Sequence, residues 1–179
     1  MRIDITIARV PGALALALGF CLGTAGMAFA MGSSQPDTPT CPRGQVYNST
    51  TKRCQAQQAG VLPDHELAEY AHVLAKAGRY DESLEVLNLL KDPDTAEALN
   101  YRGYATRHLG RLDEGIGYYL QSVKLDPKYA MVREYLGEAY VIKGDVAKAK
   151  EQLAVIQTLC GTKCEEYEDL AEAIAAKKS

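Results

Sequence analysis

The sequence predicts an all-α fold in which pairs of helices repeat along the chain. Residues 92–96 read Asp-Pro-Asp-Thr-Ala, and 34 positions later residues 126–130 read Asp-Pro-Lys-Tyr-Ala, so the frame Asp-Pro-x-x-Ala occurs twice. A fixed period of this length is typical of repeat architectures. From residue 64 onward the chain reads as consecutive amphipathic helices, and the segments 64–77 and 164–179 show apolar residues at the i, i+3, i+4, i+7 spacing of one buried face. The pattern therefore predicts a solenoid of helix pairs.

Residues 1–30 have the pattern of a secretory signal peptide. Arg2 and Arg9 precede an apolar run over 13–22, and the run is followed by the small-residue site Ala-Phe-Ala at 28–30. The alternative is a retained membrane anchor, but the run is shorter than the roughly 20 residues that a membrane span needs. We expect cleavage after residue 30 and a periplasmic or secreted protein with no membrane segment afterwards.

Composition and motifs exclude several classes of function. The net charge of −3 and the pI near 5.7 argue against nucleic acid as a partner, because such proteins carry a basic stripe. The chain has no Gly-rich phosphate loop, no Gly-x-Ser-x-Gly and no His-Glu-x-x-His. Paired acids at 81–82, 113–114 and 165–166 fall in first helical turns, where solvated carboxylates suit the helix dipole. We expect a protein that is not an enzyme and uses no cofactor.

The cysteines predict disulfides. Without the signal peptide, four remain, namely Cys41, Cys54, Cys160 and Cys164, which allow three pairings, with the two local pairs favoured by spacing. Residues 31–40 read as a disordered lead-in, residues 41–54 as a small loop closed by a disulfide, and residues 55–63 as a linker. In the loop, strands are expected at 46–47 and 50–51 around a turn at 48–49. Closing about 14 residues should stabilise this loop by roughly 3 kcal/mol.

Six helices are expected in the repeat region. The second begins near residues 81–82 and closes at Pro93, with Gly78 as the left-handed cap of the helix before it and Asp94 as the cap of the helix after it. The first should bury Leu67, Tyr70, Ala71 and Leu74, and the second Leu84, Leu87 and Leu90. The other predicted ranges are 64–77, 95–109, 112–125, 129–143 and 146–158.

A last helix is predicted over residues 164–179. Thr162 and Glu165 form a capping-box pattern at its start. It should bury Tyr167, Leu170, Ala171 and Ile174 and cover the open end of the solenoid.

Cys160 and Cys164 flank the start of this helix and permit three interpretations. In the first, they form a structural disulfide, which the helix break at Gly161 permits because residues four apart in an unbroken helix are too far apart to be bonded. Alternatively they are a redox pair, since a thiol near a helix N-terminus has a lowered pKa. The third interpretation is a metal site.

Glycines within predicted helices also need a reason, because Gly in a helix costs about 1 kcal/mol relative to Ala. Close approach of the paired helix is the expected reason at Gly103 and Gly137. Gly115 and Gly117 occur together in one helix, so the helix at 112–125 is expected to be the softest.

The repeat region resembles the tetratricopeptide repeat (TPR) family. The third unit matches best, with Leu136-Gly137-x-x-Tyr140 followed by Ala149, Leu153 and Ile156. The second unit keeps Gly103, Tyr119 and Pro127 but departs from the family at Arg102, Thr106, Gly115 and Ser122. The resemblance covers about 100 residues and implies a right-handed helix-turn-helix solenoid of three TPR-like repeats, at 64–95, 96–129 and 130–163, plus the C-terminal capping helix.

The resemblance further implies a scaffold for protein–protein interaction, whose first helices line a concave face. Some family members bind a terminal carboxylate with a Lys/Asn/Arg clamp, but the corresponding positions here hold Ala68, His72, Tyr101, Met131 and Tyr135, so that clamp is absent. The leading hypothesis is an exported, non-enzymatic scaffold for a protein or peptide partner. The alternative is a thiol-redox or metal-handling accessory protein acting through Cys160 and Cys164. The face would present His72, Asn100, Tyr104, Arg107, His108, Met131, Glu134 and Glu138 to the partner, with His65 beside them.

Overall fold

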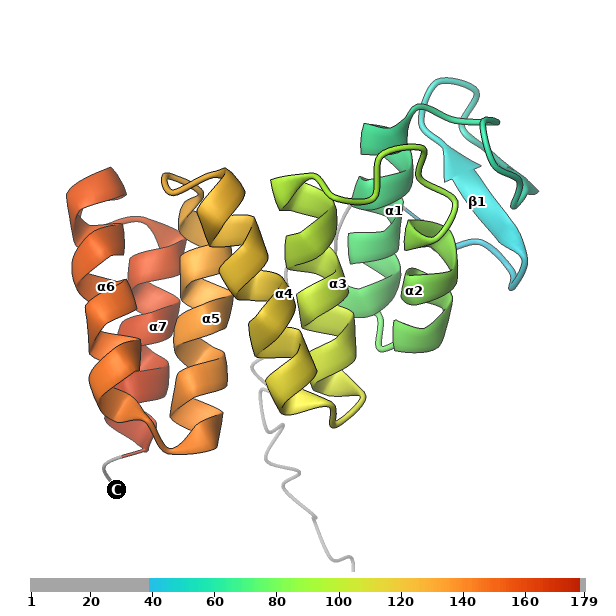
Figure 1. Ribbon diagram of the computed structural model, residues 1–179. Helices are drawn as coiled ribbons and strands as arrows, with labels where there is room; N and C mark the ends of the chain where they lie inside the picture. Colours follow the sequence, from blue (N-terminus) through green and yellow to red (C-terminus); the bar gives the residue numbers. More distant parts are fainter. Residues whose placement is uncertain (1–38, 178–179) are drawn as a thin grey trace, which may run out of the picture. The chain divides into compact units, whose positions relative to one another are not determined.

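The computed structural model describes residues 39–177, which form a two-stranded sheet followed by seven helices (Figure 1). The predicted signal peptide at 1–30 and most of the lead-in at 31–40 lie outside the described residues. None of the helices described is both long and apolar enough to cross a bilayer. The elements in chain order are β1 (Gln45–Asn48), β2 (Arg53–Ala56), α1 (Asp64–Lys76), α2 (Tyr80–Leu87), α3 (Ala96–His108), α4 (Leu112–Leu125), α5 (Ala130–Lys143), α6 (Val146–Cys160) and α7 (Glu165–Ala176).

The helices pack as three consecutive pairs, α1 with α2, α3 with α4, and α5 with α6. The first helix of each pair also contacts the first helix of the next, and α7 packs against both α5 and α6. The predicted fold class, a right-handed solenoid of three TPR-like helix pairs with a capping helix and a disulfide-bonded N-terminal loop, is confirmed.

The two Asp-Pro segments make the same turn between helix pairs. The Asp126 carboxylate accepts a hydrogen bond from the Lys128 amide at 2.9 Å, and the Asp92 carboxylate accepts one from the Asp94 amide at 3.4 Å. Two predictions about the first segment were wrong. α2 already ends at Leu87, not at the proline, and the cap of α3 is Thr95, whose hydroxyl accepts from the Ala98 amide at 3.1 Å, and not Asp94.

Close approach between helices explains three of the four helical glycines. A Cβ at Gly103 would lie 2.6 Å from the Tyr119 ring, and a Cβ at Gly115 would lie 2.9 Å from the Gly103 carbonyl oxygen. At Gly137, however, a Cβ would meet Leu170 of α7 at 2.5 Å, so the neighbour is the capping helix and not the expected paired helix. Gly117 has no atom within 4 Å of such a Cβ.

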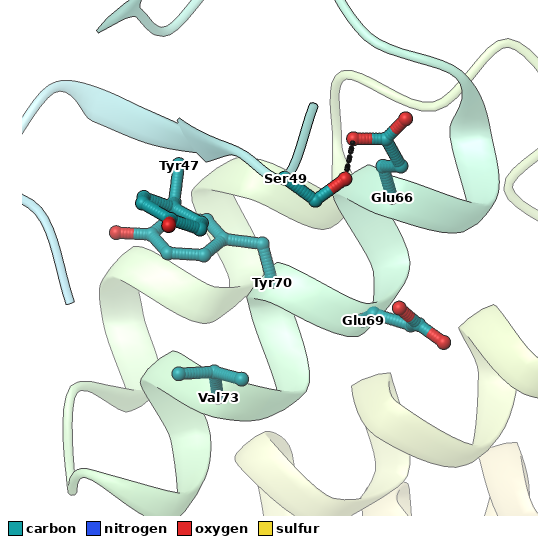
Figure 2. Close-up of a pocket in the computed structure, with 6 residues that line it drawn as sticks. All are labelled: Tyr47, Ser49, Glu66, Glu69, Tyr70 and Val73. Atoms are coloured by element: carbon teal, nitrogen blue, oxygen red, sulfur yellow. Dashed lines mark hydrogen bonds between the residues drawn. The ribbon is translucent and has the colours of Figure 1, made fainter. Parts of the chain in front are cut away.

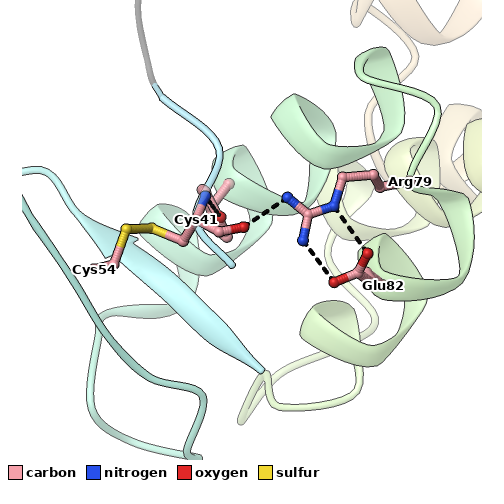
Figure 3. Close-up of a disulfide and its surroundings, with 5 residues drawn as sticks. Cys41, Cys54, Arg79 and Glu82 are labelled. Carbon is pink, nitrogen blue, oxygen red and sulfur yellow. Dashed lines mark hydrogen bonds and ion pairs between the residues drawn. A yellow bond between two sulfur atoms is a disulfide. The ribbon is translucent and has the colours of Figure 1, made fainter. Parts of the chain in front are cut away.

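The N-terminal hairpin is fixed by its disulfide and by α1 and α2. Cys41 and Cys54 are bonded, with their Cα atoms 5.7 Å apart. The Cys41 amide donates to the Tyr70 hydroxyl, and its carbonyl oxygen accepts from the Arg79 guanidinium, both at 2.7 Å. Arg79 is itself held by a bidentate pair with Glu82 at 2.8 and 2.6 Å (Figure 3). The returning strand was predicted too early, because residues 49–52 form the turn and β2 begins at residue 53.

A small hollow separates the hairpin from α1 (Figure 2). Tyr47 and Tyr70 line one side of it, and Ser49 donates to Glu66 at 2.8 Å on the other. Val46 of β1 is fully buried in the same apolar cluster as Leu67 and Leu74 of α1, so the hairpin contributes to the core.

The rest of the core is formed by buried residues of α4, α5, α6 and α7. Tyr119, Leu136, Ile156 and Leu170 are its fully buried residues of largest volume, and Met131 packs against both this cluster and the one beneath the hairpin. The expected buried faces are confirmed in α1, whereas Leu84 in α2 and Tyr167 and Ala171 in α7 are only half-buried. The expected capping box at Thr162 does not form, since the residue before α7 is Cys164 and no side chain caps the helix.

Candidate partner-binding face

The first helices α1, α3 and α5 share one face of the array, here called the first-helix face. Its centre is a group of four aromatic rings, His72, Tyr101, Tyr104 and Tyr135. His72 stacks on Tyr101 with ring centroids 4.4 Å apart, and its Nε2 lies 3.3 Å from the Tyr135 hydroxyl. Tyr104 lies against Tyr135 at 4.9 Å. Because each ring touches rings from another helix, the cluster ties the three helix pairs together.

Burial keeps these rings uncharged near neutral pH. It lowers the pKa of His72 to about 4, with a smaller contribution from the nearby Lys76 cation. Burial also raises the pKa values of the tyrosine hydroxyls at 101, 104 and 135. The centre of the face is therefore aromatic and neutral, and its charges lie around it.

Arg107 is the cation within this face. Its side chain is only 5% exposed, and its Nη2 donates to the Glu138 carboxylate at 2.8 Å. The guanidinium lies 5.5 Å from the Tyr104 ring centroid and 5.9 Å from that of Tyr135. Its Nε and Nη1 are buried and have no hydrogen-bond partner among the residues described. The pKa of Arg107 remains raised, because Tyr119 and Glu138 act against the effect of burial.

Glu134 is the buried acid of the face, at 6% exposure. Burial and, to a smaller extent, the negative charges of Glu138, Asp169 and Glu166 together raise the pKa of its carboxyl to about 8, against the Lys76 cation. A carboxyl with this pKa is largely protonated at neutral pH.

The predicted site residues differ in how far they are exposed. His72, Tyr104 and Met131 are half-buried on the face, and His108 is exposed, with its ring 4.3 Å from Tyr104. Asn100 was expected on the exposed side of its helix, but it is fully buried and donates to the Tyr129 hydroxyl at 3.2 Å. His65 is exposed.

The sequence interpretation named Tyr101 and Tyr135 only as positions that lack the clamp, and thus missed that they are central to the ring cluster. The repeat period held the signal, because Tyr101 and Tyr135 are 34 residues apart and occupy equivalent positions in successive units. The same register pairs Tyr104 with Glu138, so the face changes from aromatic to acidic along the array.

The second cysteine pair is also bonded. Cys160 and Cys164 form a disulfide with their Cα atoms 6.0 Å apart. Their sulfurs and a Glu166 oxygen lie within 4.8 Å of one another, the only such group of metal-ligating atoms within residues 39–177. Since a metal binds the thiolate and not the disulfide, this bond would first have to be reduced.

Comparison with known proteins agrees with this fold. A family model described as tetratricopeptide repeat matches residues 69–130. The TPR repeat-containing thioredoxin TTL4 of Arabidopsis thaliana is 26% identical over 116 residues, which are 63% of this chain and 17% of that protein. The chain thus spans about a sixth of the length of that relative.

Solved structures show the same likeness. The type III secretion chaperone SycD of Yersinia enterocolitica, in complex with a peptide of the translocator YopD, has a TM-score of 0.52 at 22% identity, over 64% of this chain and 91% of that one. The first TPR of Spaghetti (RPAP3), bound to the HSP90 peptide SRMEEVD, has a TM-score of 0.55 at 19% identity, over 68% of this chain and 98% of that one. At these identities the likeness concerns the fold. Together with the family match, it supports a tetratricopeptide-repeat protein.

Proposed function

We propose that this chain is an exported, non-enzymatic scaffold that binds a protein or peptide partner through its first-helix face. The observation that carries the proposal is the cluster of His72, Tyr101, Tyr104 and Tyr135, flanked by the ion pair of the buried Arg107 with the half-exposed Glu138. Tyrosine and arginine are the residue types that dominate binding energy at protein interfaces. Rings held in place by neighbouring helices lose little entropy when a partner is bound.

The structural neighbours support the class of partner. SycD and RPAP3 share the fold, and both have been solved with a peptide bound. A protein or peptide partner for this chain is in keeping with them. The acidic balance of the sequence, at a net charge of −3, favours such a partner over nucleic acid.

Export is supported by the pattern of residues 1–30 and by the two disulfides, which persist in oxidising compartments. We therefore place the working protein in the periplasm or outside the cell. N-terminal sequencing of the protein recovered from its host should give a chain that begins at Met31. Recovery of the intact N-terminus in a membrane fraction would contradict cleavage and favour an anchor.

The binding face is tested by affinity purification with a matched pair of variants. Tyr104→Ala/His108→Ala removes two rings from the first-helix face, whereas Tyr118→Ala removes a half-buried ring from α4. Arg107 is left in place, because its loss would leave Glu138 unpaired and confuse binding with stability. We expect the wild type and Tyr118→Ala to recover the same partner and the double variant to lose it. Identical partners for all three proteins would overturn the assignment of the face.

A further inference from the structure

Four acidic side chains meet at one end of the first-helix face. Glu134 and Glu138 are one turn apart on α5, and Glu166 and Asp169 are three residues apart on α7, which packs against α5. Residues at these spacings share one side of a helix. A Cβ at Gly137 of α5 would lie 2.5 Å from Leu170 of α7, so Glu134 and Glu166, each about one turn before these residues, lie on adjoining helices. In keeping with this geometry, the charges of Glu138, Asp169 and Glu166 act on the Glu134 carboxyl. They are called the acidic cluster below.

Within this cluster, Glu134 lies buried at the bottom, and the other three acids lie around it, closer to solvent. Glu134 is 6% exposed, and no hydrogen bond from residues 39–177 is among the causes that shift the pKa of its carboxyl. Glu138 and Glu166 are half-exposed, and Asp169 is exposed. A buried carboxyl without a partner is costly to ionise, and a cation placed next to it removes that cost.

The cations of the protein itself do not neutralise the cluster. Arg107 binds the Glu138 carboxylate on the side toward the aromatic rings. The Lys76 cation of α1 also lowers the pKa of Glu134, but it makes the smallest of the contributions to that pKa. Its ammonium lies over the Tyr104 ring, 5.7 Å from the ring centroid. With Glu134 largely protonated at neutral pH, two cations face three charged acids, and Glu138 is paired with Arg107, so the remaining negative charge lies at Glu166 and Asp169 of α7.

We propose that the first-helix face takes a basic segment of its partner and that a lysine or arginine of this segment sits on the acidic cluster above Glu134. This inference rests on the proposed function and adds the chemistry of the ligand to it. The neighbouring half-buried Tyr104 ring, packed against the buried Tyr135, would contact the apolar part of the same segment. The preference is opposite in sign to that expected of a carboxylate clamp, whose cationic positions are occupied here by Ala68, His72, Tyr101, Met131 and Tyr135.

A random peptide library tests the proposal without knowledge of the natural partner. The exported protein, immobilised through its C-terminus, is used to select heptapeptides in parallel with three variants. Glu134→Gln/Glu166→Gln removes the buried carboxyl and one of the surrounding carboxyls and leaves the pair of Glu138 with Arg107 intact. Glu151→Gln/Glu168→Gln replaces the same number of carboxyls at exposed positions outside the cluster. Tyr104→Ala reports on the face itself.

We expect peptides selected by the wild type to be enriched in lysine and arginine. Their affinity should fall by about tenfold or more for Glu134→Gln/Glu166→Gln, because loss of one side of a buried charge pair has at least this effect. It should be unchanged for Glu151→Gln/Glu168→Gln. Peptides that require Tyr104 but carry no basic excess, or that bind both double variants equally, would overturn the basic-segment proposal and leave the binding face intact. If no peptide is selected, or if the selected peptides are indifferent to Tyr104→Ala, both proposals fail.

Proton release gives a second measurement that a change in stability would not imitate. Burial, together with Glu138, Asp169 and Glu166, raises the pKa of Glu134 to about 8, and a bound cation favours its ionised form. Binding of a selected basic peptide at neutral pH should therefore release a proton, measurable by calorimetry in buffers of different ionisation enthalpy. Glu134→Gln should abolish this release, and a release that persists in this variant would contradict the role of Glu134.

Discussion

Gly115 and Gly117 are two residues apart in α4, and we expect replacement by alanine to have opposite effects on stability at the two positions. A Cβ at Gly115 would lie 2.9 Å from the Gly103 carbonyl oxygen and 3.1 Å from Cβ of Arg107. A Cβ at Gly117 would have no atom within 4 Å. Both glycines are in a helix, so alanine gains the same helix propensity at each. Any difference between the two variants therefore measures the close approach of α3 to α4.

The expected magnitudes follow from two opposing effects. Replacement of a helical glycine by alanine stabilises by about 1 kcal/mol where space is free. Overpacking against a neighbour that cannot retreat costs about 1–3 kcal/mol, and the nearest atom here belongs to the backbone of α3. Gly117→Ala should therefore stabilise by about 1 kcal/mol, and Gly115→Ala should be neutral or destabilise by up to about 2 kcal/mol. For a domain of this size, each kcal/mol corresponds to roughly 2–4 °C in Tm.

Urea unfolding followed by far-ultraviolet circular dichroism measures both variants against the wild type. Gly103→Ala is the matched partner on α3, because its Cβ would meet the fully buried Tyr119 ring at 2.6 Å, and it should destabilise as well. Equal effects of Gly115→Ala and Gly117→Ala would refute the packing argument. The same experiment bears on the prediction that this helix is the softest, which amide hydrogen exchange would test directly.

Four further predictions follow from charge and covalent structure. The pKa of Glu134 rises from 4.5 to about 8 on folding, so the carboxyl does not destabilise the fold below pH 4.5, and its destabilising effect grows up to pH 8. Thermal unfolding across pH should therefore show that Glu134→Gln stabilises the fold at pH 9 and not at pH 4. The pKa of His72 falls from 6.5 to about 4, so stability should be lost as pH falls through this interval, and a His72→Phe variant with the same pH dependence as the wild type would contradict this. Arg79→Met should cost roughly 1.5–3 kcal/mol through lost charged hydrogen bonds and make the hairpin sensitive to trypsin, whereas an unchanged digestion pattern would count against its role as an anchor. Cys160 and Cys164 should resist thiol labelling in urea without reductant, and labelling of either in the freshly purified protein would favour the redox alternative.

Features that depend on local pattern were predictable from the sequence. The helix pairs follow from the repeated Asp-Pro frame and from apolar spacing, and the left-handed cap at Gly78, with φ of 78°, follows from glycine at a helix end. Helix ends were less predictable where two residues compete for one role. At the start of α3, both Asp94 and Thr95 are good capping residues, and only the path of the turn decides that the threonine hydroxyl reaches the Ala98 amide.

Features that depend on contacts between repeats were harder to predict. Periodicity placed Asn100 and Tyr104 on the same side of α3, but in the folded protein Asn100 is fully buried and bonded to Tyr129, whereas Tyr104 is half-buried. Similarly, Gly137 indicated a close neighbour without indicating that the neighbour is Leu170, because α7 is not part of the repeat. The raised pKa of Glu134 could not be predicted from the sequence either, since it arises first from burial and then from Glu138 and from the acids of α7, which folding brings alongside.

The two ends of the helix array are finished in different ways. At one end, Val46 and Cys41 of the hairpin are buried against α1, and at the other, Leu170 and Ile174 of α7 are buried against α5 and α6. A helix pair from a second molecule would have to displace one of these covers before it extended the stack. The hairpin cover is a cross-linked loop, whereas α7 is a single helix joined to α6 by a short disulfide-spanned turn. Any growth of the array by stacking, or exchange of an end between molecules, would therefore begin more easily at α7.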